Sequence, residues 1–195
     1  MNWLQELAKS HPPNDEQANV YGVILYTASH ANIRKVINDE DYWKAFDEKS
    51  GPRWMVFATR AEPGEYRLPD THRDSMGLML PVWKEPRANK KLLDEFQIDS
   101  TENLPLFMVF SDPSKGEVRR ALLDLDDSSI KDAYGSIKTA LGVVAKSLDK
   151  IEIEYLHKDT AYDAADLAIE NHRQWENIKK GVGAFDKIKS YFSLM

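Results

Sequence analysis

Leu104-Pro105-Leu106-Phe107-Met108-Val109-Phe110 is the stretch from which the fold of this chain is best inferred. An apolar run of this length, ended by the turn sequence at 111–116, is typical of a strand buried on both faces. Its proline falls among the first residues of the strand, where a missing N–H is tolerated. A second strand is expected over 117–124, so the two segments predict a β-hairpin.

Two further buried strands are predicted before this hairpin, over 20–26 and 53–59. Apolar residues recur at helical spacing between them, and Asn38-Asp39 is either a break with a new cap or a solvent-facing point in one bent helix. Gly51-Pro52 ends the helical segment, because glycine accepts the left-handed cap and proline cannot continue a helix. Two buried strands joined by helix predict a βαβ unit with parallel strands.

Helices are also predicted over 2–9, over 88–96 and from Ser128 or Ser129, as N-cap, to about Leu148. Asp124-Leu125-Asp126-Asp127 is interpreted as a lead-in that complements the dipole of this last helix. Residues 62–86 are rich in proline and glycine but contain apolar side chains, so we expect an ordered insertion.

The composition changes after Lys150. Residues 151–155 alternate like a short strand or an extended link, and a helix is expected from 159 to 180. Gly181-Val182-Gly183 is expected to break that helix, and 184–194 to form a last amphipathic helical piece.

The composition excludes several classes of protein. The chain has 195 residues and a net charge of −6, which argues against a general nucleic-acid binder with its basic stripe. It has no cysteine, which excludes disulfides, thiolate catalysis and cysteine-ligated metals. No apolar run reaches the roughly 18 residues that span a bilayer, and the first residues do not resemble a signal peptide. We expect a cytoplasmic protein that binds neither nucleic acid nor membrane.

The order of predicted elements resembles the thioredoxin-like superfamily. The local match is a helix at 93–98, the strand at 104–110 and, after a tight turn, the strand that begins at 116–120. The resemblance covers about residues 20–148. It implies an α/β fold with a thioredoxin-like βαβ–αββα core, a mixed sheet with helices on both faces, and a cis Leu104–Pro105 bond.

On this basis the chain divides into three parts. They are an N-terminal helix and linker (1–19), a thioredoxin-like domain with an insertion at 62–86 (20–150), and a C-terminal helical extension (151–195).

The sequence departs from thioredoxins at the redox motif. Thioredoxins carry Cys-x-x-Cys where the first strand runs into the first helix, and the matching positions here are Ser29-His30-Ala31-Asn32. A serine hydroxyl cannot cycle between dithiol and disulfide, so thiol–disulfide exchange is excluded.

The end of the first strand is a candidate binding site. Ligands of open α/β folds bind at the carboxyl ends of parallel strands, and a helix N-terminus there favours an anion. The candidate ligand-binding residues are Tyr26, Ser29, His30, Asn32, Leu104 and Pro105. The alternative is that Ser29 caps the helix and His30 is a surface histidine. No catalytic residue is assigned, because adjacent side chains such as Ser29 and His30 seldom point at each other as a nucleophile pair requires.

Other signals for ligands are absent. The five histidines show no close metal spacing and no glycine-rich phosphate loop occurs, so we expect no metal and no cofactor.

The aromatic residues of the C-terminal extension are candidates for binding a partner, because exposed aromatic side chains anchor interfaces. They are Trp175, Phe185, Tyr191 and Phe192. The alternative is that they pack back on the domain as an extra helical layer.

Two functions follow. The first is a redox-inactive thioredoxin-like binding or adaptor module, with a protein partner or as a homodimer. The alternative is an enzyme similar to glutathione transferases, which have a thioredoxin-like domain followed by helices. That resemblance implies that Tyr26 or Ser29 activates a ligand thiol, although the helical extension here is short for that family.

Overall fold

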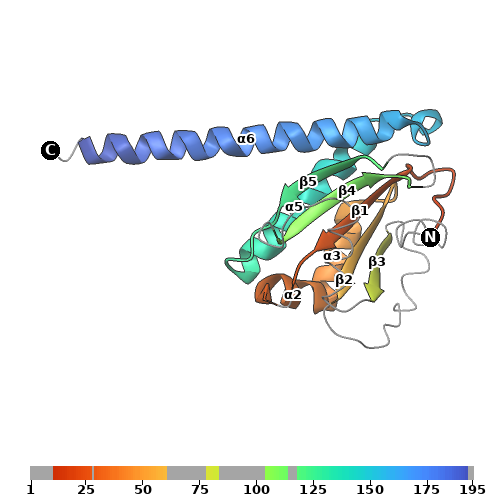
Figure 1. The fold of residues 1–195 in the computed structure, drawn as a ribbon, viewed down its shortest axis with the longest axis horizontal. Coiled ribbons are helices and arrows are strands. Elements are labelled where there is room, and N and C mark those ends of the chain that lie inside the picture. Colours follow the sequence, from red (N-terminus) through yellow and green to blue (C-terminus); the bar gives the residue numbers. More distant parts are fainter. Residues whose placement is uncertain (1–10, 28, 61–77, 84–103, 114–117, 193–195) are drawn as a thin grey trace.

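The structure is a computed structural model (Figure 1), which describes residues 11–27, 29–60, 78–83, 104–113 and 118–192. For 59, 60, 78–83 and 178–192 it describes the backbone. The described elements, in chain order, are β1 (Val20–Leu25), α2 (Ala31–Asn38), α3 (Glu40–Ser50), β2 (Met55–Arg60), β3 (Leu78–Trp83), β4 (Leu106–Ser111), β5 (Arg120–Asp124), α5 (Ile130–Leu148), the 3-10 helix η3 (Ile153–Tyr155) and α6 (Asp159–Phe192).

The described strands form one mixed sheet in the order β3-β2-β1-β4-β5. β1 and β3 both run parallel to β2, whereas β4 runs antiparallel to β1 and to β5. The predicted parallel pairing of β1 with β2 and the predicted hairpin of β4 with β5 are therefore confirmed. At the centre of the sheet, Ile24 of β1 pairs with Phe107 on one side and with Ala58 on the other.

β3 lies in the segment 62–86, which was expected to be an ordered insertion but for which no strand was predicted. It adds a parallel strand beyond β2, and Pro81 within it pairs with Ala58. A proline is tolerated in this strand because β3 is at the edge of the described sheet, where one side of the strand needs no hydrogen-bond partner.

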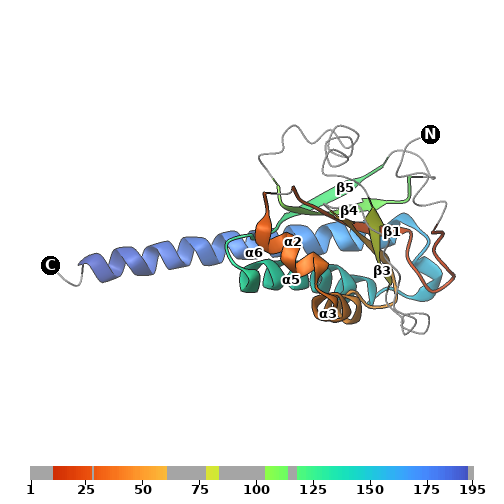
Figure 2. The ribbon, with the colours of Figure 1, turned by 90° about the horizontal axis from the view of Figure 1, so that it is seen from below.

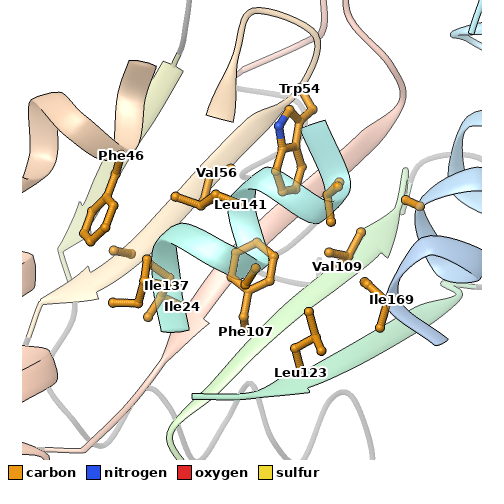
Figure 3. Close-up of a cluster of buried hydrophobic side chains, with 14 of the residues drawn as sticks. Ile24, Phe46, Trp54, Val56, Phe107, Val109, Leu123, Ile137, Leu141 and Ile169 are labelled. Atoms are coloured by element: carbon orange, nitrogen blue, oxygen red, sulfur yellow. The ribbon is translucent and has the colours of Figure 1, made fainter. Parts of the chain in front are cut away.

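One face of the sheet carries the main core. Figure 2 shows α2, α3 and α5 lying together on this face, and the first part of α6 packs there too. Trp54 and Phe107 meet edge to face at a ring distance of 5.9 Å. Their neighbours in Figure 3 come from every layer of this core: Ile24, Val56 and Val109 from the sheet, Phe46, Ile137 and Leu141 from α3 and α5, and Ile169 from α6.

The other face of the sheet is also apolar and buried. Tyr21 stacks on Phe110 with ring centroids 5.4 Å apart and on Phe57 at 6.3 Å, and His11 meets Phe57 at 6.0 Å. The described helices all belong to the first face. The helices predicted over 2–9 and 88–96, on which the expectation of helices on both faces depends, lie outside the described residues.

The ends of α3 and the start of α5 are set by capping residues of the chain. Asp39 begins α3 by accepting hydrogen bonds from the backbone N–H groups of Asp41 and Tyr42, so Asn38-Asp39 is a break with a new cap. Gly51 ends α3 with a φ of 70°, which glycine adopts without strain. Ser129 is the N-cap of α5, because its Oγ accepts from the N–H of Asp132 at 3.1 Å.

Two predictions after Lys150 are wrong. Residues 153–155 form a 3-10 turn instead of an extended link, and the turn brings Leu156 into the core. The helix that follows is not broken at Gly181-Val182-Gly183 but continues to Phe192. Glycine in a helix interior costs only about 1 kcal/mol relative to alanine and, unlike proline, removes no hydrogen bond.

Candidate functional site

His30 is the centre of the polar contacts at the end of β1. The backbone N–H of Thr27 donates to His30 Nδ1 at 2.9 Å, so the ring hydrogen lies on Nε2. Nε2 then donates to the Leu104 carbonyl at 3.0 Å. The Leu104–Pro105 bond is cis, as the resemblance implied. His30 therefore ties the turn between β1 and α2 to the residues that begin β4, and is not simply a surface histidine.

Asp127 holds the N-terminus of α2. Its Oδ1 accepts from the backbone N–H of Ile33 at 2.6 Å, and its carbonyl accepts from Asn32 Nδ2 at 2.7 Å. A helix N-terminus favours a negative charge, and here the loop before α5 supplies it. The place predicted to attract an anionic ligand therefore already holds a carboxylate of the chain.

Ser29 does not cap α2, which corrects one of the two interpretations of this residue. His30 occupies the N-cap position, where it makes no side-chain capping bond, and the Ser29 Oγ lies 2.5 Å from the Thr27 Oγ1. Both His30 ring nitrogens are within hydrogen-bond distance of Thr27 or Leu104. A Ser29–His30 nucleophile pair is therefore not formed.

The six predicted ligand-binding residues fall into separate groups. His30, Leu104 and Pro105 come together at the start of β4, whereas Asn32 contacts Asp127. Tyr26 is only 2% exposed and belongs to the core beneath the helices. The contacts of His30 and Asn32 connect the start of α2 to the residues before β4 and to the loop before α5. The six residues do not line one open site.

Sequence reasoning missed Asp127 as part of this region. The aspartates at 124–127 were interpreted as complementing α5, but the Asp127 carboxylate caps α2, 94 residues away in sequence from Ile33. No local pattern encodes a contact at that separation.

α6 is attached to the domain at its beginning. Ala161, Ala165 and Ile169 are buried in the main core. Arg119, just before β5, pairs with Asp163 at 2.7 Å and lies 4.4 Å above the ring of Tyr162. That hydrogen bond raises the pKa of Arg119.

Other positions of α6 are exposed. Leu167, between the buried Ala165 and Ile169, is 62% exposed, and Trp175, beyond them, is 57% exposed. Figure 1 shows the second half of the helix continuing beyond β5 and α5. Trp175 is on the same helix as Ala161 and Ala165, but its exposure places it outside the buried face of that helix. Phe185, Tyr191 and Phe192 lie on the same continuous helix.

An open groove of about 740 Å³ lies between α5, α6 and the loop before α5. Its lining includes Asp126 and Asp132, but both carboxylates are engaged at the start of α5. Asp126 accepts from Ser128 and Asp132 accepts from Ser129. These two carboxylates of the groove are therefore already engaged by serine hydroxyls of the chain.

The part of the chain that the structure describes holds no cluster of three histidine, aspartate or glutamate side chains arranged for a metal ion. Within the same residues, no helix combines the length and the apolar character needed to cross a membrane.

Comparisons with protein-family models, with curated proteins and with solved structures found no match.

Proposed function

We propose that this protein is a redox-inactive thioredoxin-like binding or adaptor module whose C-terminal helix contacts another protein. The observation that carries the proposal is α6. This helix has 34 residues, which corresponds to about 50 Å. One side of its first turns is buried in the domain as far as Ile169. Leu167, on another side of these turns, and Trp175, beyond them, are each more than half exposed.

Large apolar side chains on a projecting helix favour a contact function. Tryptophan is among the residues that most often contribute a large share of interface binding energy.

The mixed sheet supports the thioredoxin-like part of the proposal. The parallel β1–β2 unit is joined through β1 to the antiparallel β4–β5 hairpin. The redox-inactive part rests on the sequence, which has no cysteine to form a thiolate.

The geometry does not favour the glutathione-transferase-like alternative. Tyr26 would have to reach a ligand thiol, but its side chain is 2% exposed. Ser29 is exposed, but its Oγ contacts the Thr27 hydroxyl, which is not a base.

The test uses single substitutions in the full chain. Removing the extension after Lys150 would strip Ala161, Ala165 and Ile169 from the core, so a truncated chain would not isolate the contact surface. Trp175→Glu places a charge on the exposed part of α6. Asn177→Glu, at an exposed position two residues further on, is the matched control.

Affinity capture from native lysate, read by mass spectrometry, compares the three chains after circular dichroism shows that each is folded. The proposal predicts proteins, additional copies of this chain included, that the unsubstituted chain and Asn177→Glu retain and Trp175→Glu loses. Equal capture by all three chains would contradict it.

A further inference from the structure

We propose that the protein bound by α6 is a second copy of this chain, and that the two α6 helices pair antiparallel. This inference rests on the proposed function, because it takes α6 as the contact surface. It goes further by naming the partner and the direction in which the partner lies.

The pairing surface is a stripe along α6 that we call the seam. Its positions are spaced alternately by four and three residues, the heptad spacing of helices that pack side by side. The seam consists of Ala164, Ala168, Asn171, Trp175, Ile178, Val182, Phe185, Lys189 and Phe192. Because α6 is one continuous helix over all of them, its register places these positions on one side.

Beyond Ala168 the seam lies on a different side of α6 from the residues that pack on the domain, and Ala164 and Ala168 at its start are half-buried. At 3.6 residues per turn, Trp175 lies about a third of a turn around the helix from Ile169. Ile169 is 2% exposed, whereas Trp175 is 57% exposed and Asn171 is exposed. Leu167, which is 62% exposed, lies beside the seam and would widen the contact.

The sizes of the seam residues favour an antiparallel pair. The seam begins with two alanines, Ala164 and Ala168, and its last part contains Phe185 and Phe192. A parallel pair would set alanine against alanine and phenylalanine against phenylalanine. An antiparallel pair instead sets Ala168 against Phe192 of the second copy at both ends, a small residue against a large one.

The charges of α6 favour the same direction. Residues 159–177 contain five carboxylates and one arginine, whereas 178–192 contain four lysines and one aspartate. An antiparallel pair brings the basic half of each helix to the acidic half of the other. A parallel pair would bring like charges together at both ends.

One register satisfies the polar residues of the seam. When the two helices cross at Lys180, Asn171 faces Lys189 of the second copy, Trp175 faces its Phe185, and Val182 faces its Ile178. A polar pair inside an otherwise apolar seam sets register, because any slip leaves it opposite apolar groups.

The second half of α6 also benefits from a partner. It contains Gly181 and Gly183, each about 1 kcal/mol less favourable in a helix than alanine. The half at 178–192 is short, and isolated helices shorter than about 12–15 residues are only marginally stable in water. Tertiary packing normally supplies the missing stability. A second copy on the seam supplies packing to this half.

The first experiment measures the mass of the purified full chain by sedimentation equilibrium. We expect twice the chain mass of 22.4 kDa. Trp175→Glu and Val182→Glu should each weaken association by about 100-fold or more, because every dimer loses two apolar anchors. Asn177→Glu should leave association unchanged. Two seam variants keep the result interpretable if one of them fails to fold.

Salt and cross-linking test the direction. Added salt screens charges, so it should weaken an antiparallel pair and strengthen a parallel one. Because the chain has no cysteine, single cysteines can be placed without background. We expect a maleimide cross-linker to join Ala168→Cys chains to Phe192→Cys chains. Efficient cross-linking of Phe192→Cys to itself would overturn the antiparallel arrangement.

The outcomes separate this inference from the proposed function. A monomeric full chain that still loses captured lysate proteins on Trp175→Glu would overturn the second-copy inference and leave the binding function standing. A monomeric full chain with no effect of Trp175→Glu on capture would overturn both.

Discussion

Asp127 shows how a single residue joins distant parts of the chain. Its carboxylate receives the Ile33 N–H and its carbonyl receives the Asn32 side chain, so the loop before α5 holds the start of α2. His30 makes the corresponding link between the start of α2 and the start of β4.

Asp127→Ala should therefore destabilise the protein. Losing a helix cap, and leaving the Ile33 N–H without its acceptor, should lower the free energy of unfolding by about 1–2 kcal/mol. Urea unfolding followed by circular dichroism measures the change. Asp124→Ala removes an exposed carboxylate from the same segment as a control. If both variants unfold at the same urea concentration, Asp127 does not have this role.

Gly22 tests the packing of β1. A Cβ at this position would lie 2.8 Å from Trp54 Cζ3 and 2.9 Å from Phe107 Cζ. Gly22→Ala should therefore lower the free energy of unfolding by about 1–3 kcal/mol, because the two rings are fixed in the core. Gly135→Ala on α5 meets nothing within 4 Å and should be neutral or stabilising. Thermal unfolding of both variants measures the difference, and a stabilised Gly22→Ala chain would refute this packing.

Only some contacts of the candidate site could be predicted from the sequence. The neighbourhood of His30 and Leu104 was predictable, because both were assigned to the same edge of one sheet. The role of Asp127 was not, because its partners are set by tertiary packing over a long sequence separation. Tyr26 was predicted at the site, but its side chain is buried in the core.

Among the elements, those with strong apolar periodicity were predicted well. β1, β2, β4, β5 and α5 all lie where the sequence placed them, since each buries a regular row of side chains. β3 was missed because prolines and glycines around it resemble a loop. The end of α6 was misjudged because glycine was given the weight of a helix break.

Gly183→Ala tests whether glycine limits the stability of α6. Alanine should stabilise the helix by up to about 1 kcal/mol and raise its helix content. Far-UV circular dichroism during thermal unfolding reports the change, and Gly135→Ala serves as a control in another helix. Lower helix content in Gly183→Ala would mean that the backbone at this position is not helical.

The whole molecule should lose stability at high pH. Burial, and to a smaller extent the nearby Asp112, raises the pKa of Tyr21 above the ordinary tyrosine value of 10.0. Burial, and to a smaller extent the nearby Asp166, raises the pKa of Tyr162 in the same way. Above pH 10 the unfolded chain releases these protons while the folded chain keeps them. The free energy of unfolding therefore falls as pH rises through that value.

Urea unfolding between about pH 8 and about pH 11 measures this dependence. Tyr21→Phe should show a weaker loss above pH 10 than the unsubstituted chain. Tyr155→Phe, which removes an exposed hydroxyl, is the control. Equal losses in all three chains would show that Tyr21 does not contribute.

The central claim for the molecule is that the projecting half of α6 is held by contact along the seam. Amide hydrogen exchange of residues 178–192, in the purified full chain and in Trp175→Glu, tests it most directly. We predict slow exchange in the full chain and fast exchange in the variant, because the glycine-containing half needs its partner to stay helical. Fast exchange in both chains, or slow exchange that Trp175→Glu leaves unchanged, would contradict the claim.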